Sequence, residues 1–277
     1  YGFTFCISKF KKMVSYSMPL VLSGIGVFIA LYIDRIAIKD LLGLNELGIY
    51  GVGYRFAAVT FLVMAGFQQS LSPLVFKHYK ERKTPSDISK IFNIFTIFAL
   101  FVIAVAILFA KELVVLFTTE AYYSSASFIA ILVMAVFFSH MYIFAPGIGI
   151  AKKTKIISMI SISSAILNTI LNYSLIPVFG LSGAAYATLI SAVSTFSLYI
   201  IISQKYYLIP YQAKPILFAF IIVLISSYGV VSIFDEIQFI SIIVKMVYLL
   251  LAVVTTSLLL IEKKHLQKIK LKIGKKY

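Results

Sequence analysis

Residues 89–110 read Ser89-Lys-Ile-Phe-Asn-Ile-Phe-Thr-Ile-Phe-Ala-Leu-Phe-Val-Ile-Ala-Val-Ala-Ile-Leu-Phe-Ala110, and Lys90 near the edge is their only charge. A helix of about 20 mostly apolar residues is long enough to cross a lipid bilayer. Such long, evenly apolar runs also differ from the alternating pattern of about 10 residues that barrel strands show. Seven further stretches have the same character: 14–38, 46–73, 126–150, 156–176, 181–203, 214–233 and 238–261. We therefore expect an all-α, polytopic transmembrane helix bundle of about eight spans.

The overall composition also favours a chain that is dissolved in lipid. Of 277 residues, 61% are hydrophobic and 13% are charged, whereas about 25% of the residues in a soluble domain are charged. The net charge of +15 does not indicate nucleic-acid binding, because it is dispersed among short loops and a C-terminal tail. We expect these loops to bind anionic membrane lipids and not nucleic acid.

The basic residues collect in every second gap between the apolar stretches. The clusters are Lys9–Lys12, Lys77–Lys90, Lys152–Lys155, Lys205–Lys214 and Lys263–Lys276. About 20 lysines and arginines fall in these gaps and about 3 in the others, and basic loops stay on the cytoplasmic side of a membrane. This pattern predicts a multi-pass protein of the plasma membrane with both ends of the chain in the cytoplasm.

Arg55 is the most informative residue inside a predicted span. It lies about nine residues into the stretch 46–73, roughly 13 Å from its outer boundary at 1.5 Å per residue. An arginine at that depth costs at least about 2.5–3.5 kcal/mol unless it meets water or a partner. It either lines a wet cavity and binds an anion such as a phosphate, or pairs with an acid on another helix. We favour the first interpretation, because Gly51, Gly53 and Ala57 leave space around it.

Four other ionisable residues within the predicted spans are candidates for a functional or a structural role. Asp34 and Arg35 lie near the outer end of the first span, either at the rim of a cavity or as a solvated pair. His140 lies in the middle of a span, where it either titrates near neutral pH or hydrogen-bonds within the bundle. Lys245 is expected to extend its ammonium group outward to the membrane surface.

A polar stripe runs along the fifth span. Its members recur at steps of three and four residues and therefore share one helix face: Ser158, Ser161, Ser164, Asn168 and Asn172. Such a stripe either bonds across helices or lines a cavity. On the second span, Tyr50 and Tyr54 either contact sugars or anchor the helix at the interface.

The sequence lacks the motifs of several enzyme classes. It has no pair of histidine or cysteine metal ligands at i,i+3 or i,i+4 spacing and no phosphate loop of the G-x-x-x-x-G-K-[ST] form. No loop is long enough to hold a catalytic domain. We therefore expect neither a cofactor nor an enzymatic activity.

Four segments, taken together, carry a family resemblance. They are residues 16–24 with 32–38, residues 43–55, residues 69–79 and residues 176–188. In this order and spacing they resemble the polysaccharide transporter branch of the MATE-like flippase superfamily, which includes O-antigen and teichuronic-acid exporters. The resemblance extends over roughly residues 14–203.

The resemblance implies a fold of two six-helix lobes, often followed by two extra helices. Residues 14–203 would be the second lobe, 204–261 the extra pair, 1–13 a cytoplasmic linker and 262–277 a basic cytoplasmic tail. The first lobe of the same protein would then be a missing partner. In related flippases, arginines in a central cavity engage a lipid diphosphate, and Arg55 matches such a position more closely than Arg35.

The expected function is that of a flippase in the bacterial inner membrane. It would export an undecaprenyl-diphosphate-linked oligosaccharide by alternating access, with substrate contacts from Arg55, Arg35, Asp34, Tyr54, His140, Asn168 and Asn172. A multidrug or cation antiporter is the first alternative, although the sequence places no acid at mid-membrane depth for ion coupling. A membrane-embedded oligosaccharide polymerase or ligase is the second alternative, although the external stretch 111–125 is short for one. A scaffold without transport activity is the third.

Overall fold

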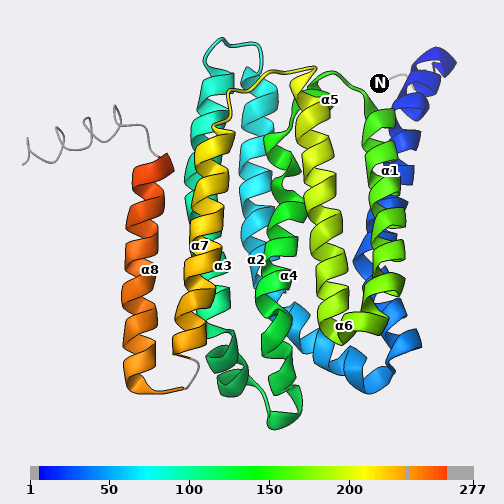
Figure 1. Ribbon diagram of the computed structural model, residues 1–277. Helices are drawn as coiled ribbons and strands as arrows, with labels where there is room; N and C mark the ends of the chain where they lie inside the picture. Colours follow the sequence, from blue (N-terminus) through cyan, green and yellow to red (C-terminus); the bar gives the residue numbers. More distant parts are fainter. Residues whose placement is uncertain (1–5, 235–236, 261–277) are drawn as a thin grey trace, which may run out of the picture. The chain divides into compact units, whose positions relative to one another are not determined.

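The computed structural model describes residues 6–234 and 237–260, and every regular element in these ranges is a helix (Figure 1). The elements are α1 (Ile7–Leu41), α2 (Leu44–His78), α3 (Thr84–Phe117), η1 (Glu120–Ser125), α4 (Ala126–His140), η2 (Met141–Phe144), α5 (Gly147–Ile150), α6 (Thr154–Gln204), α7 (Ala213–Ile233) and α8 (Phe239–Leu260). The prediction of an all-α chain is confirmed. The basic tail 262–277 and residues 1–5 of the predicted linker lie outside the described residues.

Seven helical segments in the described part of the chain are long and apolar enough to cross a membrane, and the longest of them contains two crossings. α6 has 51 residues, about 76 Å if straight, against a hydrocarbon core of about 30 Å. Gly180 interrupts the helix with φ 58° and ψ −137°. The Thr195 hydroxyl nevertheless donates to Ser164 Oγ at 2.6 Å, across 31 positions of chain. α6 is therefore an antiparallel hairpin with arms 154–179 and 181–204, which correspond to the predicted spans 156–176 and 181–203.

The fourth predicted span, 126–150, is not one regular helix. α4 ends at His140, the short 3₁₀ helix η2 follows, and α5 begins directly after Pro146. Proline has no backbone N–H, and its ring clashes with the preceding turn, so it favours a kink or a break in a helix. The break explains why the chain changes its helical geometry inside this span.

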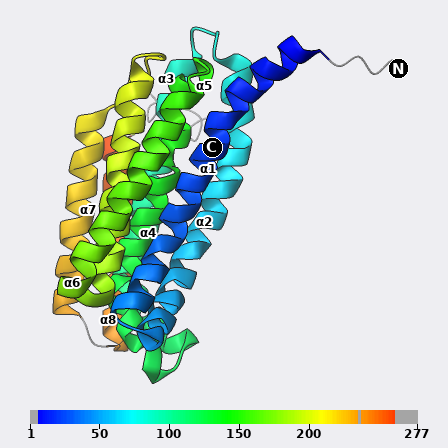
Figure 2. The same cartoon turned by 90° about the vertical axis from the view of Figure 1, so that its right-hand side faces the viewer.

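The described residues pack into two units, which we consider separately. Unit 1 contains residues up to Tyr79 and Ile131–Leu208. In it, α1 runs alongside the first arm of α6 (Figure 2). Ser23 Oγ lies 2.8 Å from Ser161 Oγ, and Tyr173 donates to Asp40 at 3.3 Å, so the two helices run in the same direction. The polar stripe thus bonds across helices at Ser161.

Unit 2 contains Lys80–Ala130 and the described residues from Ile209 onward. α3 packs against α7 and α8 around a buried core of Leu100, Ala104, Ala219, Val223 and Leu260. The third span therefore packs with the two C-terminal helices. The predicted division into residues 14–203 and 204–261 stays a prediction about the family fold.

Lys245 of α8 does not reach a polar surface. Its side chain is 2% exposed, and its Nζ pairs with Glu112 Oε1 of α3 at 2.5 Å. Removing a charge from water is costly unless a partner compensates it. The prediction that Lys245 extends outward was therefore wrong, because its partner comes from another helix.

Candidate functional site

Asp34 is buried in the hairpin between α1 and α2. Its side chain is 3% exposed, and the Tyr50 hydroxyl donates to Oδ2 at 2.8 Å. The backbone N–H of Arg35 donates to Oδ1 at 2.8 Å. Gly43, with φ 102°, makes the turn that brings the two helices together, since a positive φ favours glycine. The alternative of a solvated pair is thus wrong for Asp34.

Arg35 lies against aromatic rings at the same end of the hairpin. Its guanidinium carbon is 4.4 Å from the Tyr54 ring centroid and 5.3 Å from that of Tyr32. Nη1 lies 3.7 Å from Asp34 Oδ1, and the side chain remains 29% exposed. A guanidinium attracted to ring faces keeps N–H donors at its edge. The structure therefore brings Asp34, Arg35 and Tyr54 together, as three of the predicted site residues.

Arg55 follows Tyr54 directly on α2, and its side chain is exposed. Among the described residues it makes no hydrogen bond or ion pair, so the structure gives no support to a pair with an acid on another helix. Gly53 and Ala57, one on each side, are buried. We use the name arginine surface for Arg35, Tyr54 and Arg55, of which Arg35 and Tyr54 are in contact and Arg55 is the next residue along α2.

Asn168 and Asn172 are buried in the first arm of α6, with 2% and 0% exposure. Asn172 Nδ2 donates to the Asn168 carbonyl at 2.9 Å, and Asn172 Oδ1 has no hydrogen-bond partner among the described residues. These amides do not reach the surface of the unit. Their role in substrate binding stays a prediction.

The register of the α6 hairpin places a further polar side chain at this level. Gly183 packs on the Leu175 carbonyl, and Ser164 pairs with Thr195. Thr188 of the second arm is therefore level with residues 170–171, next to the two asparagines. Its hydroxyl donates to the Ala184 carbonyl oxygen at 3.0 Å, and the side chain lies near the Tyr50 hydroxyl. Asp34 and Tyr50 are buried and hydrogen-bonded to each other, and the half-buried Thr188 adds a polar group from α6 beside Tyr50. Sequence analysis missed Thr188, because Tyr50 lies on a distant helix.

His140 lies apart from the arginine surface. Its ring meets Phe61 of α2 edge-on at 5.1 Å, six residues beyond Arg55 and therefore about 9 Å farther along the helix. Nδ1 is 2.9 Å from the Val136 carbonyl oxygen and donates to it. His140 thus forms a hydrogen bond within its own helix, which agrees with the second of the two predicted alternatives, a hydrogen bond within the bundle.

The site offers cations, aromatic rings and a buried carboxylate. The residues that the structure describes contain no group of three or more His, Cys, Asp or Glu side chains arranged to hold a metal. The geometry therefore supports binding of an anion by exposed guanidinium groups beside aromatic rings.

A comparison with protein-family models matches residues 19–174 to the MatE family, which is more than half of the chain. The match extends from α1 into the first arm of α6 and includes Asp34, Arg35, Tyr54, Arg55, His140, Asn168 and Asn172, but not Thr188. Comparisons with curated proteins and with solved structures find no match. MatE proteins are transporters and not enzymes, so the polymerase or ligase alternative is excluded. The chain belongs to the MatE family, and it is a multi-pass membrane transporter.

Proposed function

We propose that this transporter moves an undecaprenyl-diphosphate-linked oligosaccharide from the cytoplasmic to the outer leaflet of a bacterial inner membrane. The observation that carries the proposal is the arginine surface. A lipid diphosphate needs fixed cations within the membrane, and the attached sugars need aromatic and polar contacts.

Arg55 is the residue that we assign to the diphosphate. It is exposed and has no described carboxylate within ion-pair distance, so its guanidinium donors remain available. A guanidinium binds phosphate oxygens through two parallel hydrogen bonds. Because an unpartnered arginine inside a membrane is costly, its presence on a span favours a ligand that neutralises it.

Arg35 is the second cation, and the neighbouring groups hold it in place. Tyr54 lies under its guanidinium at 4.4 Å, and Asp34, itself fixed by Tyr50, lies beside it. This support orients the guanidinium before a ligand arrives, which reduces the entropy cost of binding. Tyr54 also offers the edge of its ring and a hydroxyl to a sugar.

The alternating-access cycle requires a second lobe. In our proposal, the first six-helix lobe of the same protein faces the arginine surface across a hydrated cavity, and the two lobes rock about the bound headgroup. The charge pattern of the loops supports an orientation with both ends of this chain in the cytoplasm.

One observation favours a second candidate, a cation-coupled antiporter. Asp34 is a buried carboxylate with neutral donors from Tyr50 and the backbone, and Asn172 Oδ1 is a buried acceptor without a described partner. Buried acids within spans often mark ion or proton pathways. Transport of a drug or cation that is driven by a sodium or proton gradient, in proteoliposomes without lipid-linked oligosaccharide, would favour this candidate.

The test is translocation of lipid-linked oligosaccharide in proteoliposomes that contain the full-length transporter. We expect Arg55→Ala to reduce the rate at least about tenfold, since a charge-assisted hydrogen bond contributes about 1.5–3 kcal/mol. Arg55→Lys should retain part of the activity. Arg82→Ala, in a basic loop, is the matched control. Unchanged transport by Arg55→Ala would overturn the proposal.

A further inference from the structure

Two cavities of unit 1 lie on the same seam, where α1 runs beside the first arm of α6. One has a volume of about 470 Å³ and is lined mainly by lysines. The other has a volume of about 410 Å³ and is lined almost entirely by apolar side chains. Neither includes a residue of the arginine surface, so together they make a separate site.

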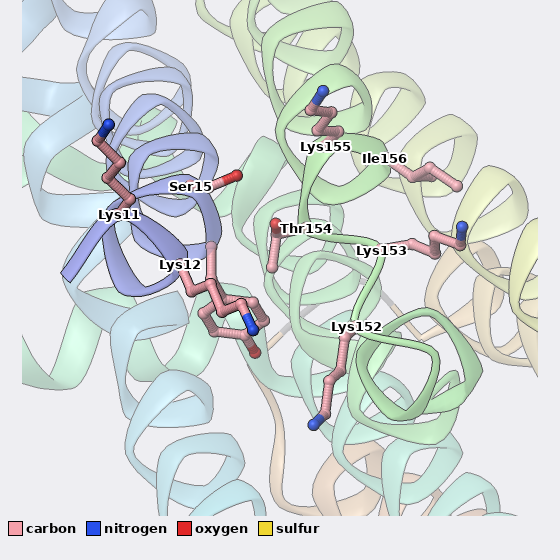
Figure 3. Close-up of a pocket in the computed structure, with 9 residues that line it drawn as sticks. Lys11, Lys12, Ser15, Lys152, Lys153, Thr154, Lys155 and Ile156 are labelled. Atoms are coloured by element: carbon pink, nitrogen blue, oxygen red, sulfur yellow. The ribbon is translucent and has the colours of Figure 1, made fainter. Parts of the chain in front are cut away.

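The basic pocket is formed where both helices begin. Figure 3 shows its side chains on α1 and on the turn that leads into α6. The five cations that line it are Lys11, Lys12, Lys152, Lys153 and Lys155. No carboxylate lines it, and none of the five lysines is paired with an acid in the described part of the chain. Five like charges around one cavity repel one another unless an anion neutralises them.

The backbone turn before α6 holds two of these lysines, Lys152 and Lys153, in place. Lys152 has φ 55°, a conformation that residues with a side chain rarely adopt. The Lys153 N–H donates to the Ile148 carbonyl at 3.1 Å and closes the turn. Figure 3 shows Thr154 and Ser15 on facing sides of the pocket, so hydroxyl groups are available beside the ammonium groups.

The apolar groove continues the seam into the spans. α1 contributes Leu22, Ile25 and Ile29, and α6 contributes Ile162, Ile166 and Ile170. Each set recurs at three- or four-residue steps and therefore lies on one face of its helix. All six side chains are exposed. Ala165 and Gly26 form the floor, where the two backbones approach closely.

The spacing between the two cavities fits one amphipathic molecule. Lys12 precedes Leu22 by ten residues and Lys155 precedes Ile162 by seven, so the groove begins about 10–15 Å farther along the helices. It then extends about another 10–12 Å, to Ile29 and Ile170. A bilayer lipid has the same order, with a phosphate in the interfacial region and hydrocarbon chains that run toward the midplane.

We propose that this seam binds one anionic phospholipid, with its phosphate headgroup in the lysine pocket and an acyl chain in the groove. Charge complementarity assigns the headgroup, because the pocket has five cations and no acid. The adjoining apolar groove assigns a lipid as the occupant, because a free phosphate would leave it unused. A second polypeptide packed on the six isoleucine and leucine side chains is the competing occupant, and the experiment distinguishes it from a lipid.

The test uses photoreactive lipids and the full-length transporter in nanodiscs. Phosphatidylglycerol and phosphatidylcholine carry the same diazirine-labelled chain, and labelled peptides are located by mass spectrometry. We expect phosphatidylglycerol to label residues 22–29 and 162–170 at least about fivefold more than phosphatidylcholine, since basic residues near a membrane surface attract anionic lipids. Equal labelling by the two lipids would overturn the proposal. Labelling of residues 22–29 and 162–170 that is no higher than labelling of the buried residues 128–137 would also overturn it, and would assign the seam to a polypeptide.

Three variants connect the label to the pocket. Lys12→Gln/Lys152→Gln/Lys155→Gln should lower phosphatidylglycerol labelling to the level of phosphatidylcholine. The control Arg82→Gln/Lys83→Gln/Lys205→Gln removes the same charge from exposed positions outside the pocket and should leave labelling unchanged. Arginine at the same three pocket positions should also preserve it. An equal loss in the control contradicts a specific site.

A soluble competitor separates a lipid from a free anion. Inorganic pyrophosphate in millimolar excess should leave phosphatidylglycerol labelling in place, because it cannot fill the groove. Displacement of the lipid by pyrophosphate would assign the pocket to a soluble anion and overturn the lipid site.

Discussion

The two packing units each bury a carboxylate on a spanning helix, but they compensate it differently. In unit 2, Glu112, whose side chain is 14% exposed, pairs with Lys245, which is 2% exposed, so the pair is largely enclosed. In unit 1, Asp34 accepts hydrogen bonds from Tyr50 and a backbone N–H, while the nearest cation, Arg35, stays 29% exposed. The first arrangement neutralises a charge permanently, and the second leaves a cation available at the surface. Substitutions that remove one group at a time test this contrast.

The largest loss of stability is expected from Lys245→Met. It leaves Glu112 buried without its partner, and breaking a buried pair in this way costs about 3–5 kcal/mol. Thermal unfolding in detergent measures the change. The double variant Lys245→Met/Glu112→Leu should recover most of the loss, and a double variant as unstable as the single one would contradict the enclosed pair.

Tyr50→Phe should have a smaller but clear effect on unit 1. It removes the hydroxyl that donates to Asp34 at 2.8 Å, and a buried acceptor left without its donor costs about 1–3 kcal/mol. The control is Tyr173→Phe, which removes an exposed 3.3 Å bond to Asp40 and should leave the melting temperature unchanged. Equal effects of the two variants would show that Asp34 does not depend on Tyr50.

Tyr54→Leu should lower stability still less. The contact between Arg35 and the Tyr54 ring contributes about 0.5–1 kcal/mol at a partly exposed position. The same variant should weaken transport more than it lowers the melting temperature, because Arg35 loses the ring that orients it. A double-mutant cycle with Arg35→Gln measures the coupling, and a coupling of zero would contradict the stacked arrangement.

Arg55→Ala should have the smallest effect on stability, within about 0.5 kcal/mol, as for surface substitutions away from structural features. Its effect on transport should nevertheless be large. Comparison with Lys245→Met therefore separates a charge that serves the fold from one that serves a ligand. A large fall in the melting temperature of Arg55→Ala would place Arg55 with the structural charges.

The spans were predictable from the sequence, whereas their partners were not. Hydrophobic length is a local property, so the stretch 89–110 falls within α3, and even the two arms of α6 were expected as separate spans. Arg55 was identified for the same reason, since a charge in an apolar run is visible without a structure. The burial of Asp34 and the pairing of Lys245 depend on Tyr50 and Glu112, which approach from other helices. Interhelical packing, not local composition, decides those two environments.

The reversal at Gly180 has a mechanical consequence. One residue with φ 58° turns the chain back, and the Thr195–Ser164 hydrogen bond joins the arms about 15 positions from the turn. We expect the two arms to move together during any rearrangement of the transporter. The second arm carries Thr188, which lies near Tyr50, the donor to Asp34, so a shift of the hairpin should also reach that carboxylate.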